Sequence, residues 1–377
     1  MGTLRDFKLE VYFGRHEFSA PHLLAQSDCE SMTVSELLEF EPEAEQRLKD
    51  AWLGYTEVPG DPELRDLVAS LYTTMDGDDV LVHTGAQEAV FAYMSVLLEP
   101  GDHVISMYPT YQSLYEVALS QGCEVSRWSL MDMGNGWTLD FDELRGLLRP
   151  NTKLIVVNTP NNPTGYTLNE EEIRELCRIA SGQGINIFAD EVYKGLDLDG
   201  ARRPWVADVY DRATSLGVMS KAYGLAGLRI GWVASKDAAL LDRQLRFKHY
   251  MSICNSAPSE CLAVIALKQG DRLLERNREI IRGNLALADA FFKRCGGLFA
   301  DHPPQCGPVA FHRMNKEVDM GEFCEELVRK SGVLLLPSTA YEYPGPYFRM
   351  GYGRRNFAES LRVFEEHLTE QGLVQRG

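Results

Sequence analysis

Three polar segments of this chain hold side chains that could do chemistry together. They are MSKAYGLAGLRIGWVA with Lys221 and Arg229, FADEVY with Asp190 and Tyr193, and NTPNNPTG with Asn162. An amine, a carboxylate, a phenol and an amide at one site can move protons, and a guanidinium can hold an anion through a charge-assisted fork. Each residue alone has an ordinary interpretation as a turn residue, a helix cap or a solvated side chain. The chemistry therefore depends on whether the fold brings them together.

Short apolar runs that alternate with amphipathic stretches predict the elements that would position these residues. The run from residue 79 is typical of a strand, a tight turn and a helix, and further strands are expected in HVISMYP, KLIVVNTP, INIFADEVY and ATSLGVMSK. This alternation favours an α/β fold with a doubly wound, mainly parallel sheet that helices cover on both faces. The polar residues follow the carboxyl ends of successive strands, where such sheets bind ligands. We therefore expect one shared site.

Taken together and in this order, the motifs resemble those of the fold-type I pyridoxal-phosphate enzymes, specifically the class I and II aminotransferases. The resemblance extends from residue 55 to about residue 349. It implies that Lys221 holds the aldehyde of pyridoxal 5′-phosphate as a Schiff base. It also implies that Asp190 keeps the pyridine nitrogen protonated, so that the ring accepts electrons in a quinonoid intermediate. Asn162 and Tyr193 would bind the ring 3-oxygen, and the released Lys221 amine would shuttle the α-proton as a general base.

The same resemblance implies a phosphate site at the start of a helix. The candidate backbone donors follow the turn in HTGAQEAV and are Gly85, Ala86 and Gln87. Arg229 would add a charged fork, and Ser220 would add a hydroxyl. One position departs from the family pattern, because Val218 stands where Ser or Thr is common, three residues before the lysine. One phosphate contact is therefore expected to be missing or replaced.

The resemblance also implies further binding residues and a partner subunit. Tyr111 in YPTYQSLY resembles the aromatic residue that stacks on the cofactor ring. Arg349 in YFRMGYG resembles the arginine that forks onto the substrate α-carboxylate, with Asn162 beside it. Tyr55 in GYTEVPGDPELR would reach the phosphate of the neighbouring subunit. These expectations describe a homodimer with shared active sites and an amino acid as its small-molecule substrate.

The N-terminal arm departs from the family, whose members begin with a short glycine-containing segment that lines the substrate carboxylate pocket. HLLAQSDCESMTVSELL stands in its place. The charged and titratable residues of the arm lie either near the cleft mouth or on a solvated face, and they are Glu10, His16, Glu17, His22, Asp28 and Glu30. We predict that Glu10, His22 and Asp28 bind substrate. Carboxylates such as those of Glu10 and Asp28 would favour a substrate with a cationic side chain such as a guanidinium.

Transamination of a free L-amino acid is the predicted function. An alternative is based on a looser resemblance of the arm and of FKHYMSICNSAPSECLAV to capreomycidine synthase, an aminotransferase relative that eliminates a β-hydroxyl from a hydroxyarginine and closes a ring. A non-catalytic module that binds pyridoxal phosphate is the alternative from another class. A nicotinamide-dependent dehydrogenase is disfavoured, because neither SGQG nor GLAG forms a GxGxxG turn after a first strand.

Length and composition set the remaining expectations. The 377 residues are 45% hydrophobic, and we expect an N-terminal arm with part of a small domain (1–40), a large cofactor domain (41–258) and a small C-terminal α+β domain (259–377). The net charge of -17, without a basic block, argues against nucleic-acid and anionic-membrane partners. The first residues lack a signal-peptide core, so we expect a cytoplasmic protein. The eight cysteines form no CxxC pair and indicate neither a metal site nor a disulfide framework.

Overall fold

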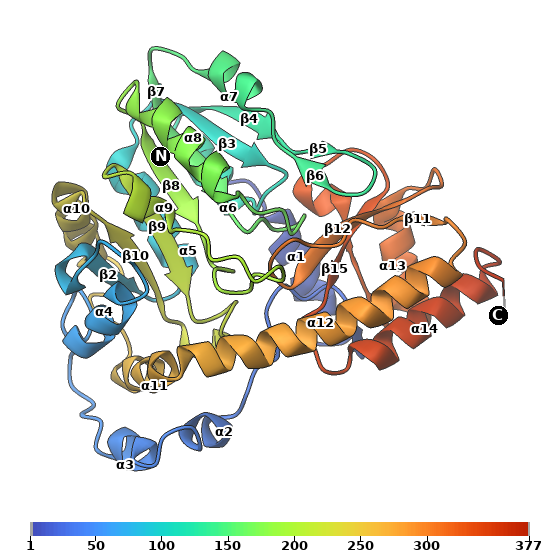
Figure 1. Cartoon of the computed structure of the whole chain (residues 1–377), viewed down its shortest axis with the longest axis horizontal. Helices are drawn as coiled ribbons and strands as arrows, with labels where there is room; N and C mark the ends of the chain where they lie inside the picture. The colour runs from blue at the N-terminus through green and yellow to red at the C-terminus, as the bar shows by residue number, and fades with distance from the viewer. Residues whose placement is uncertain (1–2, 376–377) are drawn as a thin grey trace.

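The computed structural model describes residues 3–375, and its largest element is a seven-stranded sheet (Figure 1). The strand order is β2-β10-β9-β8-β7-β3-β4. In that order the strands are Val80–His83, Gly231–Ser235, Ala213–Val218, Asn186–Asp190, Thr152–Asn158, His103–Tyr108 and Glu124–Ser129. Each neighbouring pair from β9 to β4 is parallel, whereas β10 runs antiparallel to both of its neighbours.

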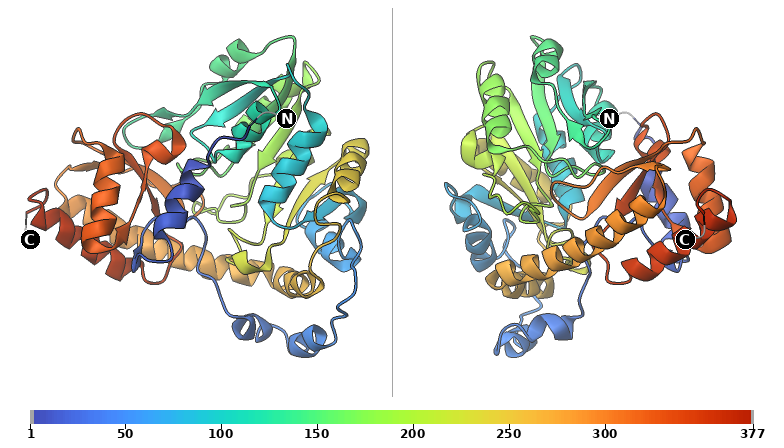
Figure 2. Two further views of the ribbon diagram at one scale, coloured as in Figure 1. Left: turned by 180° about the vertical axis from the view of Figure 1, so that it is seen from behind. Right: turned by 45° about the vertical axis from the view of Figure 1, so that its right-hand side comes forward.

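Helices cover both faces of this sheet (Figures 1 and 2). One face carries α5 (Ala86–Leu97), α6 (Ser113–Ser120) and α10 (Ala238–Lys248), and the other carries α7 (Phe141–Leu147), α8 (Glu170–Ser181) and α9 (Val206–Val209). Helix α8 illustrates why these segments fold as they do. Asn169 and Glu172 form a capping box at its start, and its apolar stripe faces the core through Ile173, Leu176, Cys177 and Ala180.

A second, smaller sheet lies toward the C-terminal end of the chain. Its strand order is β11 (Phe299–Ala300), β12 (Val309–Met314), β15 (Tyr347–Gly351) and β14 (Leu336–Pro337), and all neighbours are antiparallel. Its helices are α13 (Met320–Ser331) and α14 (Phe357–Glu370). The 25-residue helix α12 (Gly270–Arg294) follows α11 (Ala257–Lys268) and runs from beside the large sheet to the small one (Figure 1).

The N-terminal residues form separate short elements around both sheets. They are α1 (Lys8–His16), β1 (His22–Leu23), α2 (Val34–Leu38), α3 (Ala44–Lys49) and α4 (Pro62–Ala69). Strand β1 pairs in parallel with β13 (Val333–Leu334), so the arm is anchored beside the small sheet. A hairpin of β5 (Met131–Asp132) and β6 (Trp137–Thr138) extends from the large sheet.

The fold class predicted from the alternation of elements is confirmed, and the strands expected in the five apolar segments are present. Strand β4 was not expected, because most of its positions are exposed or half-buried and it lacks an apolar run. The domain limits stay a prediction, and α11 spans the limit expected at residues 258–259. Within residues 3–375, none of the helices combines the length and the apolar character that a membrane crossing requires.

Candidate active site

The carboxyl ends of β7, β8 and β9 bring the predicted polar group to one edge of the large sheet. Asn158 and Asp190 are register partners where β7 and β8 end, and Asp190 also lies opposite Leu216 of β9. Lys221 follows three residues after β9 ends. Parallel strands finish at a common edge, so residues that are far apart in the chain meet there.

The Lys221 amine is the centre of this group. Its Nζ donates a hydrogen bond to Ser27 Oγ at 2.9 Å. Enclosure of the amine lowers the pKa of Lys221 below its usual value, and the Arg349 guanidinium adds to this fall while the carboxylates of Asp28, Glu10 and Asp190 oppose it. A lysine with a lowered pKa has a larger neutral fraction and can act as a base or a nucleophile.

Asp190 is a buried carboxyl group that few protein hydrogen bonds stabilise. It is 6% exposed, and its Oδ1 accepts one long hydrogen bond, from the Val192 backbone N–H at 3.3 Å. Burial raises the pKa of Asp190 to about 7. A buried carboxylate is stable when a cation neutralises it, so this position suits a ligand that presents a protonated nitrogen.

Asn162 and Arg349 contact each other, and a tyrosine joins them. Tyr341 donates from its hydroxyl to Asn162 Oδ1 at 2.6 Å, and Arg349 Nη1 donates to the same amide oxygen at 3.0 Å and to the Tyr341 hydroxyl at 2.7 Å. Arg349 Nε and Nη2 donate to the Ala25 carbonyl at 2.9 and 2.5 Å. The guanidinium is thus oriented from several directions before any substrate arrives, which favours a defined carboxylate geometry.

Tyr193 is a buried phenol near the Ser27 hydroxyl and the Arg349 guanidinium. The side chain is 1% exposed. Burial raises its pKa above the usual range, while the Arg349 guanidinium and the Ser27 hydroxyl oppose that rise. The phenol therefore stays protonated at neutral pH and can donate a hydrogen bond to an anionic oxygen.

An anion-binding corner lies where helix α5 begins. Gly85 is the N-cap at φ 84°, and no side chain caps the helix, so the first backbone N–H groups are available to a ligand. Arg229 adopts a left-handed conformation with φ 53°, and its Nη1 donates to Ser220 Oγ at 3.3 Å. A Cβ atom on Gly85 would collide with Arg229 Nη2. Val218 is buried at the end of β9 and brings no polar atom to this corner.

We predict that Gly85→Ala weakens binding of pyridoxal 5′-phosphate by about tenfold. With φ 84° and ψ 169° this backbone conformation costs an alanine about 1–3 kcal/mol, and its methyl group would push Arg229 out of the corner. Gly101→Ala is the matched control, because Gly101 has a similar φ of 89° but open space around a Cβ atom. Absorbance titration measures both affinities. Equal affinities for the two variants would contradict the placement of the anion at Gly85.

Helix α1 brings one carboxylate of the arm to the site. Tyr111 donates from its hydroxyl to Glu10 Oε1 at 2.6 Å, and the Tyr111 ring packs tilted against Phe7 at a centroid distance of 4.8 Å. Burial, together with the Glu10 carboxylate, raises the pKa of Tyr111 well above its usual range. Glu10 therefore lies near the group around Lys221, and its contact with the substrate side chain stays a prediction.

The other predicted arm residues are placed differently. Asp28 lies close enough to influence Lys221, but its carboxylate forms a forked pair with Arg354 Nη2 at 3.0 and 2.9 Å. The prediction that His22 binds substrate requires correction, because β1 holds His22 opposite Val333 and its backbone N–H donates to Gly332. β pairing fixes this strand beside the small sheet, away from the group around Lys221.

Three further arm residues also have partners elsewhere. His16 lies 3.1 Å from Glu325 of α13, and Glu17 accepts a hydrogen bond from Gln26 at 3.0 Å. Glu30 accepts from the Arg355 backbone N–H at 2.9 Å. These contacts hold the arm to the body of the protein, and the expectation that the three residues lie near the cleft mouth stays a prediction.

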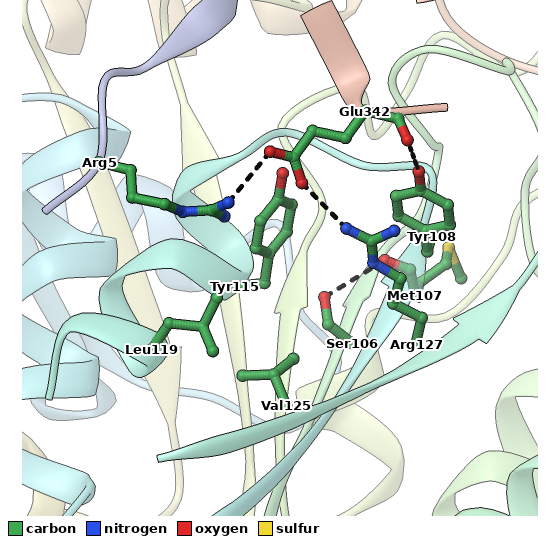
Figure 3. A pocket seen from close by; sticks show the side chains of 9 residues that line it. All are labelled: Arg5, Ser106, Met107, Tyr108, Tyr115, Leu119, Val125, Arg127 and Glu342. Atoms are coloured by element: carbon green, nitrogen blue, oxygen red, sulfur yellow. Dashed lines mark hydrogen bonds and ion pairs between the residues drawn. The ribbon is translucent and has the colours of Figure 1, made fainter. Parts of the chain in front are cut away.

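A cluster around Glu342 holds the start of the arm in place (Figure 3). Arg5 and Arg127 point toward the two carboxylate oxygens at 3.1 and 3.0 Å, and Lys8 lies 3.0 Å from the first of them. Tyr108 donates from its hydroxyl to the Glu342 carbonyl at 2.5 Å. Because Glu342 directly follows the 3-10 turn of residues 338–341, this cluster connects α1, the large sheet and the turn that carries the tyrosine bonded to Arg349.

Tyr55 lies outside the group that this chain forms by itself. Its side chain is 81% exposed, as are those of its neighbours Trp52 at 78% and Leu53 at 81%. The segment borders a hollow with Asn255, whose Oδ1 lies 3.4 Å from the Thr84 hydroxyl beside the anion corner. The expectation that Tyr55 serves a neighbouring subunit therefore stays a prediction.

With this geometry described, comparison with known proteins identifies the family. The family model for aminotransferase class I and II matches residues 22–361. This chain belongs to the aminotransferase class I and II family. The aminotransferase chain is 29% identical to capreomycidine synthase of Streptomyces vinaceus over 336 residues, which are 88% of this chain and 86% of that protein.

Solved structures agree with the aminotransferase assignment. A PLP-dependent aminotransferase from Streptococcus suis 89-1591 covers 100% of both chains with a TM-score of 0.92 and 33% identity. The PLP-dependent cyclase OrfR covers 98% of this chain and 99% of its own, with a TM-score of 0.90 and 26% identity. The family predicted from the motifs is thus confirmed, and the same fold carries both an aminotransferase and a cyclase.

Two residues of this aminotransferase site were not predicted from its sequence. Ser27 lies within the arm, and its contact with Lys221 spans 194 residues of chain. Tyr341 lies in a short turn eight residues before Arg349 and carries no motif. A signal existed only for Ser27, because the arm segment that contains it replaces the glycine-containing segment of the family. Tyr341 was identified only from its contacts with Asn162 and Arg349 in the structure.

Proposed function

We propose that this chain is a pyridoxal 5′-phosphate enzyme that transaminates a free L-amino acid. The observation that carries the proposal is the pairing of an enclosed Lys221 amine with a buried Asp190 carboxyl group that has no cationic hydrogen-bond partner among the described residues. One group is suited to an aldehyde, and the other is suited to a protonated ring nitrogen. Family membership and the PLP-dependent structural relatives support the same cofactor.

The residues present fit that cofactor at each of its polar ends. Asp190 would hold the ring nitrogen, and Tyr193 would donate to the 3-oxygen. Asn162 would also donate there from its amide nitrogen, because its amide oxygen is engaged by Tyr341 and Arg349. The phosphate would lie in the corner described above, against Gly85, Ala86, Gln87, Ser220 and Arg229. When bound, the cofactor supplies an aldehyde and an electron-accepting ring.

The chain's own residues then perform the substrate chemistry. Arg349 would bind the substrate α-carboxylate through a fork once that carboxylate replaces the Asn162 and Tyr341 contacts at Nη1, while the Ala25 carbonyl keeps holding Nε and Nη2. The Lys221 amine, with its lowered pKa, would take the proton from the α-carbon and return it at another atom. Tyr111 would cover the site from the side of α1 and limit the access of water.

Product analysis tests this proposal. The protein, loaded with pyridoxal 5′-phosphate, is incubated with a panel of amino acids, including arginine and its hydroxylated forms, with and without keto-acid acceptors. We expect a keto acid, detected by mass spectrometry, only when an acceptor is present. Bound cofactor without any product in either arm would instead identify a binding module.

A second candidate function is elimination followed by ring closure on a substrate with a cationic side chain. The observation that favours it is Glu10, a carboxylate that the arm brings to Tyr111 near the group around Lys221. Capreomycidine synthase and the PLP-dependent cyclase OrfR are among the relatives. Loss of water from a hydroxylated substrate without any acceptor would support this function over transamination.

We predict that Glu10→Gln changes KM for cationic substrates but not for neutral ones. Loss of the carboxylate should raise KM for arginine-like substrates by roughly tenfold, because a charge-assisted hydrogen bond contributes about 1.5–3 kcal/mol. KM for amino acids with neutral side chains should stay unchanged. Glu39→Gln, an exposed acid outside the site, is the control. A parallel rise for neutral substrates would show that Glu10 acts through Tyr111 rather than on the substrate charge.

The proposed enzyme is a homodimer with shared active sites. Large apolar side chains are exposed on two adjacent segments, with Tyr250 at 92% and Ile253 at 48% beside the segment that contains Tyr55. Exposed apolar patches of this kind commonly mark protein interfaces. Sedimentation measurements should give twice the monomer mass. The cytoplasmic location stays a prediction from the sequence.

A further inference from the structure

The arm segment of residues 24–30 is threaded between the small sheet and the turn that carries Lys221. Its backbone bonds Gly351 and Gly353 on one side at 2.7 and 2.8 Å, and it bonds the Lys221 carbonyl on the other side at 3.4 Å. These contacts fix the path of the segment through the site from both flanks. A side chain in the middle of the segment therefore has a defined position.

Three glycines make room for this passage. Cβ atoms on Gly351 and Gly353 would collide with carbonyl oxygens of the segment, and a Cβ atom on Gly224 would lie 2.7 Å from another. Because backbone atoms are involved, no rotation of a side chain would relieve these collisions. The close approach is therefore built into both neighbouring elements, and the segment is not a loosely attached tail.

Ser27 is the residue of this segment that faces the Lys221 amine. Nζ donates to its Oγ at 2.9 Å. The next residue, Asp28, is engaged by Arg354 and does not compete for that position. The groups with the largest charge effects on the amine are the Asp28 carboxylate, the Arg349 guanidinium and the carboxyl groups of Glu10 and Asp190. The titratable Tyr193 phenol also interacts with the Ser27 hydroxyl.

We propose that Ser27 is a positioning residue for Lys221: its hydroxyl holds the amine in the cleft and stabilises the protonated amine during proton transfer at the substrate α-carbon. The role of the amine rests on the proposed function, whereas the contact itself does not. When the amine takes the α-proton, the Cα–H bond breaks, its electron pair stays on the substrate and an ammonium forms. The serine oxygen accepts a hydrogen bond from that ammonium, which offsets part of the cost of creating a charge in an enclosed site.

The first test uses the full-length chain without cofactor and does not depend on turnover. The pH dependence of Lys221 modification by an amine-reactive reagent is measured by peptide mass spectrometry. In Ser27→Ala the midpoint should fall by about one pH unit, because the ammonium loses an acceptor. Ser27→Thr, which keeps the hydroxyl, should restore the wild-type midpoint. Ser31→Ala, an exposed serine of the same arm, is the control. An unchanged midpoint in Ser27→Ala would overturn the proposal.

The second test uses the loaded enzyme and measures exchange of the substrate α-hydrogen with solvent deuterium. Ser27→Ala should slow exchange by roughly tenfold while KM stays near the wild-type value, and Ser27→Thr should recover most of the rate. Exchange at the wild-type rate in Ser27→Ala would contradict the proposed role of Ser27. Absence of exchange in the wild-type enzyme would refute the proposed function instead, and the two failures are thus distinguishable. Thermal unfolding confirms that each variant is folded.

Discussion

Lys221→Ala should reduce turnover by at least about 10³-fold, because one substitution removes both the amine that would bind the cofactor aldehyde and the base that would move the α-proton. The structure places this amine where the ends of β8 and β9 meet the arm. Its lowered pKa suits both tasks. Single-turnover product formation, measured by mass spectrometry, gives the size of the loss.

The control for this variant is Lys153→Ala, which removes an exposed lysine from the start of β7. Turnover of the control should equal that of the wild-type enzyme. Borohydride reduction adds an independent readout, because the wild-type protein should retain cofactor covalently on the peptide that contains Lys221. Retention on a different peptide, or residual turnover above one part in about 10³, would rule out this lysine as the reactive amine.

Much of this arrangement was predictable because it depends on local patterns. Apolar runs marked β3, β7, β8 and β9, and the polar residues stood directly after them in the sequence. Once the strands were expected to be parallel, the convergence of Asn162, Asp190 and Lys221 followed from the common edge of the sheet. Their identities then pointed to the family that the comparison confirmed.

The contributions of the arm could not be predicted in the same way, because they depend on contacts between distant segments. Glu10 and His22 looked equivalent as polar residues of one arm, yet helix α1 brings Glu10 to Tyr111 while pairing with β13 holds His22 elsewhere. Periodicity in the sequence does not predict the direction in which an irregular segment turns. Ser27 and Tyr341 were missed for the same reason, since their partners lie 194 and 179 residues away in the chain.

Asp190→Asn should lower turnover on the order of 10³-fold in the loaded enzyme. The amide cannot provide the negative charge that keeps a ring nitrogen protonated, and without that proton the ring accepts electrons poorly. The control is Asp78→Asn, which changes a carboxylate whose side chain is 99% exposed. Steady-state kinetics with the donor identified by product analysis measure the effect. Wild-type turnover in Asp190→Asn would mean that the cofactor nitrogen is held by another group.

Asp190→Asn should raise the stability of the cofactor-free protein, although it lowers the turnover of the loaded enzyme. Burial raises the pKa of Asp190 from 3.8 to about 7, so the folded state favours the neutral carboxyl group. Because the folded pKa lies above the unfolded one, this stabilisation is complete below about pH 4 and is lost as the pH rises through 7. Asp190→Asn should therefore match the wild type near pH 4 and exceed it at pH 8 by a few kcal/mol in unfolding free energy.

Adding pyridoxal 5′-phosphate should reverse the order at pH 8, because a protonated ring nitrogen would neutralise the wild-type carboxylate and not the amide. If the wild type stayed the less stable protein after loading, the cofactor would not be pairing with Asp190.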